Sequence, residues 1–139
     1  MKKPPTDVKI LRAIYSTYLH DYSNYTRGAS SGRSKIYVPI EVDRIAKKLK
    51  CVPDIVFGRL YYYMDKKFRY TNSDGSEVNL FALAVGDDRH AVNFPLLASI
   101  YAQLEDETFR ADLTGAISIV ALTVSVASVA LSLFVALNP

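Results

Sequence analysis

Residues 115 to 137 form an uninterrupted stretch of twenty-three residues with no charged side chain, no proline and no amide side chain. As an α-helix this stretch extends about 34 Å, and the hydrocarbon core of a bilayer is about 30 Å thick. Inside lipid the backbone has to satisfy its own hydrogen bonds, which a continuous helix does. The stretch therefore predicts one transmembrane helix, over 113–139, behind a folded domain over 1–112.

The position of this stretch and the cysteine content predict where the protein resides. Only residues 138 and 139 follow the stretch, and no apolar segment follows the basic residues at the N-terminus. We therefore expect a tail anchor, single-pass and in contact with membrane lipid, with the folded domain in the cytoplasm. Cys51 is the single cysteine, so no disulfide forms within the chain, as is usual in a reducing compartment.

Charge is distributed unevenly along the expected domain. Residues 1–69 contain fifteen lysines and arginines and six acidic residues, a balance of +9. Residues 70–113 contain two basic and eight acidic residues, a balance of −6. The basic half can attract nucleic acid or anionic lipid, and the alternative is a dipolar surface without a specific ligand.

Hydrophobic spacing and turn residues predict a mixed domain of helices and strands ahead of the stretch. The expected elements are helices over 7–22, 40–50 and 53–67, a polar loop over 23–34, an edge strand over 35–39, and strands over 68–71 and 78–85. Asp74 and Gly75 favour a hairpin turn between the last two strands. A second polar turn over 86–90 leads to a fourth helix that can continue into the membrane helix, since neither glycine nor proline separates Leu96 from Thr114.

This order of elements resembles the winged helix-turn-helix domain, in which a β-hairpin called the wing follows three helices. The similarity extends over residues 7 to 85 and is closest over 40–83. It implies that the second and third helices turn apolar side chains toward a shared core, namely Ile45, Ala46, Leu49, Val56, Leu60 and Tyr63, with Val52 in the turn between them. The expected class is therefore α+β: a small winged-helix-like domain of three helices, a hairpin wing and a fourth helix, followed by a transmembrane helix.

In DNA-binding members of that fold the third helix enters the major groove. The resemblance therefore implies a nucleic-acid or partner-binding face built from Arg59, Tyr62, Lys66, Arg69, Lys47 and Lys48. Arginine pairs with guanine edges and lysine with phosphates. The acidic residues Asp74 and Glu77 in the expected wing argue mildly against DNA, and many winged-helix domains bind proteins instead. An ordinary solvated helix face is the alternative interpretation.

Few residues are suited to catalysis or metal binding. Asp87, Asp88 and His90 share one turn, but a single imidazole is a weak metal signal and a polar turn is the simpler interpretation. His20 is better explained as a surface or half-buried residue, and Cys51 has no recognisable histidine partner. The sequence contains no glycine-rich phosphate loop and no nucleophile elbow. We expect no enzyme activity, no cofactor and no metal.

The apolar stretch carries small residues at spacings of three and four, which place them on one seam of a helix: Ser118, Ala121, Ser125, Ser128 and Ser132. Small side chains let helices approach closely in lipid, and hydroxyl groups can bond across the contact. The heptad period predicts left-handed packing and a homo-oligomer. Two alternatives stay open: small residues that are merely tolerated in a lone anchor, and a helix buried in a soluble oligomer.

Three functions fit these patterns. The first is recognition, in which the domain binds a partner protein or DNA and the anchor holds that event at the membrane. The second is a membrane-acting effector, in which the domain controls tail helices that assemble and permeabilise the bilayer. The third is a scaffold subunit whose anchor only localises a complex.

Overall fold

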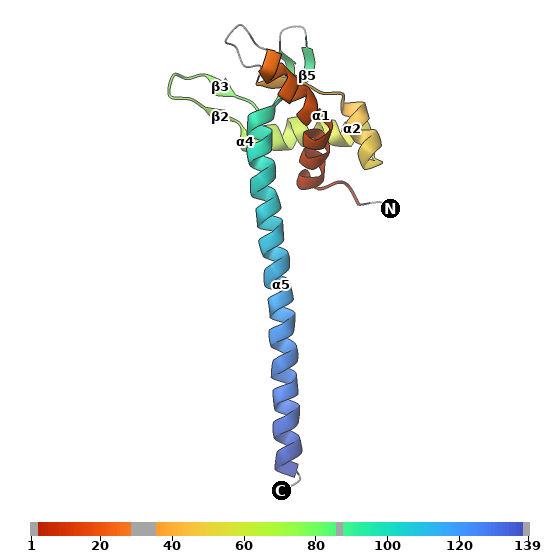
Figure 1. Ribbon diagram of the computed structural model, residues 1–139, viewed down its shortest axis with the longest axis vertical. Coiled ribbons are helices and arrows are strands. Elements are labelled where there is room, and N and C mark those ends of the chain that lie inside the picture. Colours follow the sequence, from red (N-terminus) through yellow and green to blue (C-terminus); the bar gives the residue numbers. More distant parts are fainter. Residues whose placement is uncertain (1–2, 29–35, 86–87, 138–139) are drawn as a thin grey trace. The chain divides into compact units, whose positions relative to one another are not determined.

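The structure, a computed structural model, describes residues 3–28, 36–85 and 88–137. It is an α+β protein with a small antiparallel sheet and a long apolar C-terminal helix (Figure 1). The chain divides into two compact units, which we call the head, Met1–Ala102, and the tail, Gln103–Pro139. The expected boundary at residue 112 marks the last charged side chain. The compact units divide earlier because the residues from Gln103 onward are almost all exposed.

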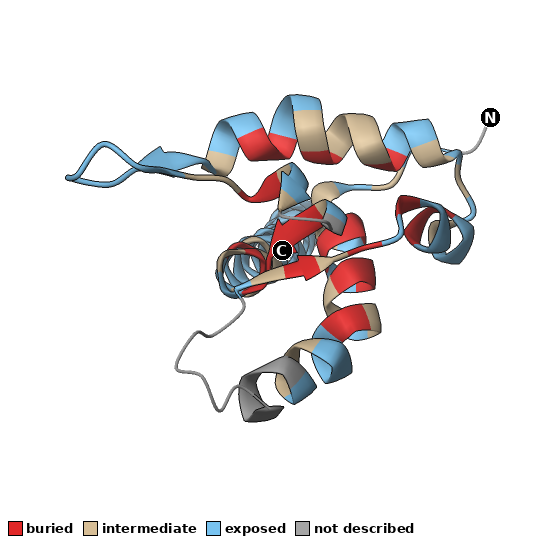
Figure 2. Ribbon diagram, turned by 90° about the horizontal axis from the view of Figure 1, so that it is seen from above, coloured by how far each residue is buried: buried red, intermediate tan, exposed pale blue. Residues whose placement is uncertain are grey.

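The first helix, α1 (Asp7–Gly28), packs into the core of the head through one apolar face. Ile10, Leu11, Ile14 and Tyr18 are buried, at the spacing that places side chains on one side of a helix. Figure 2 shows buried positions along α1, which contacts α2 and β1. The helix is longer than expected: residues 23–28, assigned to a loop from their polarity, continue it, and residues 29–35 lie outside the described part of the chain.

The helix α2 (Val42–Leu49) packs against α1 through Val42, Ile45 and Ala46, two of which the resemblance assigned to the core. The Glu41 amide donates to the Tyr18 hydroxyl at 2.8 Å, which ties the start of α2 to α1. The helix ends at Leu49 and is capped by Lys50, whose φ of 54° lies in the left-handed region. Its amide and that of Cys51 close the last turn onto the carbonyls of Lys47 and Ala46.

The expected third helix is present over Pro53–Phe68, but in three pieces: α3 (Pro53–Gly58), a π-helical turn η1 (Arg59–Met64) and α4 (Asp65–Phe68). The wider turn changes which side chains face inward. Val56, Leu60 and Met64 are buried, whereas Tyr63 is 43% exposed, so its expected core position is wrong.

The three-stranded sheet has the order β1-β5-β4, from β1 (Tyr37–Pro39), β4 (Phe81–Val85) and β5 (Asp88–Asn93). The edge position of the proline-terminated β1 is as predicted. Strand β5 was missed, because Asp88, Arg89 and His90 read as a turn. It is the central strand: Val92 pairs with Val38 on one side and Phe81 on the other.

The sequence analysis also predicted a single hairpin over residues 68–85, and the strand pairing in that prediction is wrong. The Asp74-Gly75 turn joins only β2 (Tyr70–Thr71) to β3 (Glu77–Val78), an exposed two-stranded ladder. Gly75 has a φ of 85°, which explains glycine at this turn. The following strand, β4, pairs with β5 instead, since Leu80, Phe81, Ala91 and Val92 are the side chains that reach the core.

The last helix, α5 (Phe94–Leu137), is continuous for 44 residues, as predicted from the absence of glycine and proline between Leu96 and Thr114 (Figure 1). In the head its residues Phe94, Leu97 and Ile100 are buried. In the tail the helix is exposed throughout the apolar stretch and is long and apolar enough to cross a bilayer.

Candidate functional site

The expected binding face places its first basic residue, Arg59, in an internal contact. Its guanidinium forms an ion pair with Asp7 at the start of α1, where the Nε–Oδ1 distance is 3.0 Å and Nη2 also contacts Oδ1. The same guanidinium lies over the Tyr63 ring, 4.3 Å from its centroid. These contacts join α1 to η1, so Arg59 serves the packing of the head.

Two further residues of the expected face have partners within the head. Lys48 donates to the Ser16 hydroxyl at 2.8 Å and to the Thr17 hydroxyl at 3.0 Å, both on α1. Arg69 Nη2 lies 2.7 Å from the Asp65 carboxylate, which is 1% exposed. That carboxylate also accepts a hydrogen bond from the Phe81 amide at 3.0 Å and so fixes the start of α4 to the start of β4.

The other three residues of the expected face, Lys47, Tyr62 and Lys66, have exposed side chains, and we call them the recognition face. Tyr62 is 69% exposed although it touches Phe57 and Tyr61 edge-on. Tyr62 and Lys66 lie one turn apart on the same helical segment, whereas Lys47 lies on α2. The remaining surface offers one large aromatic ring and two ammonium groups.

An aromatic cluster beside this face was not expected. The Phe57 ring stacks on Tyr61 at 5.5 Å and contacts Phe81 and His90 at 5.9 and 5.7 Å. His90 has a φ of 54° and stacks on Phe81 at 6.0 Å. In the sequence, the cluster is indicated only by the spacing of four between Phe57 and Tyr61. The contacts of His90 could not be predicted, because they depend on strand β5.

His90 lies in strand β5, and the described residues hold no group of three His, Cys, Asp or Glu side chains placed to bind a metal ion. Asp87 and the side chain of Asp88 lie outside the described part of the chain. The interactions that the structure shows for the His90 ring are packing contacts with Phe57 and Phe81.

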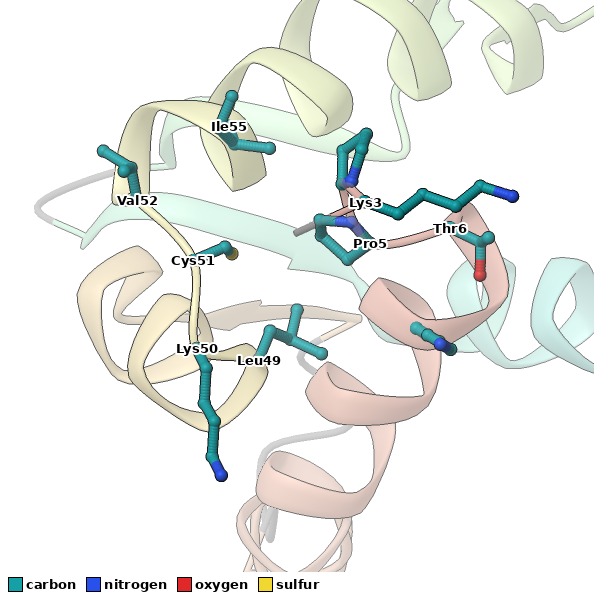
Figure 3. Close-up of a pocket in the computed structure, with 10 residues that line it drawn as sticks. Lys3, Pro5, Thr6, Leu49, Lys50, Cys51, Val52 and Ile55 are labelled. Carbon is teal, nitrogen blue, oxygen red and sulfur yellow. The ribbon is translucent and has the colours of Figure 1, made fainter. Parts of the chain in front are cut away.

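A pocket in the head was also missed by the sequence analysis. It has a volume of about 700 Å³ and lies between the N-terminal segment and the turn that joins α2 to α3 (Figure 3). The thiol of Cys51 points into it, and partial burial raises the pKa of this thiol above its ordinary value. Cys51 is therefore a neutral thiol near pH 7 and a poor nucleophile.

The small-residue seam of the tail is exposed along its full length. Each of its serine hydroxyls donates to a carbonyl one turn earlier at 2.9 Å, as in Ser118 to Thr114, Ser125 to Ala121, Ser128 to Val124 and Ser132 to Ser128. The fifth seam residue, Ala121, contributes only its carbonyl to this pattern. A hydroxyl that is satisfied by its own helix costs little in lipid and keeps its lone pairs for another partner.

Comparison with protein-family models, curated proteins and solved structures finds no match to this chain. What the head and tail do is therefore inferred from their own geometry.

Proposed function

We propose that this chain is a single-pass membrane protein whose head recognises a partner protein at the bilayer surface. The observation that carries the proposal is the exposed, uncharged stretch over residues 115–137, which continues a helix that begins in the compact head. An isolated water-soluble chain would expose this apolar surface to water. A bilayer covers it at no cost to the backbone, which is fully hydrogen-bonded within the helix.

The orientation we propose places the head in the cytoplasm. Cys51 carries a free thiol, and a chain with one unpaired cysteine is typical of a reducing compartment. In the bilayer the small-residue seam would support a homo-oligomer, because small side chains allow close contact between helices.

The recognition face favours a protein over DNA. Arg59, Lys48 and Arg69 are engaged inside the head, which removes three of the six side chains that the DNA interpretation required. The exposed ring of Tyr62 is the kind of side chain that anchors protein interfaces. The winged-helix resemblance supports a recognition role, since α1, edge strand β1, the helices from α2 to α4 and hairpin β4–β5 follow one another in that order.

A membrane pull-down with matched variants tests the recognition face. The double variant Tyr62→Ala/Lys66→Glu should lose the partners that wild-type protein retains after crosslinking in intact membranes. The control Tyr70→Ala/Arg89→Glu changes an exposed tyrosine and an exposed basic residue elsewhere and should retain them. Equal recovery of partners by both variants would contradict a role for Tyr62 and Lys66.

A binding titration distinguishes DNA from protein. If DNA were the ligand, full-length protein in detergent would shift a duplex, and the affinity would fall steeply as salt is raised. No shift at low salt is the result that a protein partner predicts.

A second candidate function, permeabilisation of the bilayer, is favoured by the serine hydroxyls of the seam, which can accept hydrogen bonds from water in an assembled pore. Expression of wild-type protein would then depolarise the membrane, and Ser125→Leu/Ser128→Leu would abolish the effect. The control Thr123→Leu also replaces a hydroxyl by leucine, but off the seam, and should leave depolarisation unchanged. An unchanged membrane potential on wild-type expression would exclude this candidate.

A further inference from the structure

The pocket between the N-terminal segment and the α2–α3 turn has an apolar lining that the folding of the head does not use. Pro5, Leu49, Val52 and Ile55 line it, and Val52 and Ile55 are 60% and 43% exposed. Its volume of about 700 Å³ falls within the range of small-molecule sites. The pocket is therefore large enough for an apolar ligand.

The charged side chains that line this pocket are all basic. They are Lys3, Lys9 and Lys50, and none of the described residues that line the pocket is acidic. The nearby carboxylate of Asp7 is occupied by Arg59. Figure 3 shows Lys50 leaving the rim in an outward direction, so its flexible stem must swing to bring the ammonium group over the opening. The rim thus complements a ligand with one anionic group.

Three backbone amides on the α2–α3 side of the pocket are already hydrogen-bonded within the chain. The amides of Lys50, Cys51 and Ile55 donate to the carbonyls of Lys47, Ala46 and Val52, each at 3.1 Å. An extended peptide would need such groups to satisfy its own backbone. A ligand whose body carries no hydrogen-bonding groups needs none of them.

We propose that this pocket binds a free long-chain fatty acid, with the acyl chain on the apolar lining and the carboxylate among the rim lysines. Transfer of the acyl chain from water onto the apolar lining lowers the free energy in proportion to the apolar area that is covered. The carboxylate stays at the rim, where the lysines attract it and water still reaches it. This site belongs to the head and does not depend on the proposed membrane function.

Cys51 is a native reporter of occupancy, because it is the only cysteine and its thiol points into the pocket. The measurement is the rate of alkylation by N-ethylmaleimide, with full-length protein in nanodiscs of zwitterionic lipid and oleate as the probe. Only unoccupied protein reacts, so at an oleate concentration ten times Kd the rate should fall about tenfold. Methyl oleate, which has the same chain without the charge, should protect far less.

Matched variants separate binding from non-specific effects of the detergent-like probe. Lys9→Glu and Lys50→Glu should each weaken protection about fivefold to tenfold, whereas Arg89→Glu, at an exposed residue outside the pocket, should not. In Cys51→Ser/Ser73→Cys the reporter sits in the exposed β2–β3 turn, and oleate should leave its rate unchanged. Equal protection by oleate and its ester, protection of the Ser73→Cys reporter, or no protection of Cys51 would each overturn the proposal. Protection by vesicles of anionic phospholipid without oleate would also overturn it, in favour of a membrane surface as the ligand.

Discussion

Replacing Asp65 with alanine should destabilise the head more than any other single change to an acidic side chain that the structure describes. The carboxylate is 1% exposed and has two partners: the Phe81 amide at 3.0 Å and the Arg69 guanidinium at 2.7 Å. Loss of the first leaves a buried amide without an acceptor, at a cost of about 2 kcal/mol. Loss of the second removes an ion pair whose arginine is 41% exposed, worth about 1 kcal/mol or less.

The expected decrease in the free energy of unfolding is therefore about 3 kcal/mol for Asp65→Ala. Asp65→Asn keeps an oxygen for the Phe81 amide and should cost about 1 kcal/mol. Glu77→Ala is the matched control within the head, since Glu77 lies 4.0 Å from the same arginine but is 61% exposed. Its effect should stay under about 0.5 kcal/mol.

Urea titration of full-length protein in detergent, followed by tyrosine near-UV circular dichroism, measures these differences. All ten tyrosines lie between residues 15 and 101 and the chain has no tryptophan, so the signal reports the head alone. A cost below about 1 kcal/mol for Asp65→Ala, or equal costs for Asp65→Ala and Glu77→Ala, would refute the reasoning from burial.

Three further changes have definite expected outcomes. Lys50→Gly should stabilise the head by about 0.5 to 1 kcal/mol in the same titration, because Lys50 holds a φ of 54° that glycine adopts without strain; a loss of stability would contradict this. At pH 8 the alkylation rate of Cys51 should be lower than that of a cysteine in an unstructured peptide, because burial raises the pKa of Cys51 and less of it is present as the reactive thiolate. For the same reason its rate should keep rising with pH above the ordinary thiol pKa. Equal rates for Cys51 and the peptide cysteine would contradict this. Ser125→Leu/Ser128→Leu should lower energy transfer between labelled copies in vesicles and Thr123→Leu should not, whereas equal transfer in all three proteins would contradict association through the seam.

The sequence predicts most of the elements because their signals are local. The helical spacing of Leu11, Ile14 and Tyr18 and the uncharged stretch over 115–137 each specify an element without reference to the rest of the chain. Strand β5 has no such signal, since only Ala91 and Val92 are apolar and the strand is recognisable only from its two neighbours in the sheet. Its omission also led to the wrong pairing for β4.

The candidate site was less predictable than the fold because a basic side chain looks the same in sequence whether it is free or paired. Arg59 and Asp7 are 52 residues apart, and only the packing of α1 on η1 brings them together. Likewise, the π-helical turn moves Tyr63 out of the core, and no residue type in Arg59–Met64 marks that turn in advance. The pocket joins residues 3–9 to residues 49–55 and so required the tertiary structure.

Flotation after alkaline carbonate washing tests the membrane assignment most directly. Full-length protein should remain with the lipid, because residues 115–137 present an exposed apolar helix about 34 Å long. Val124→Arg/Leu131→Arg, which places two charges in that stretch, should shift the protein toward the washed fraction. Wild-type protein that stays in the supernatant without detergent, unaggregated, would contradict the assignment and would place the helix inside a water-soluble assembly.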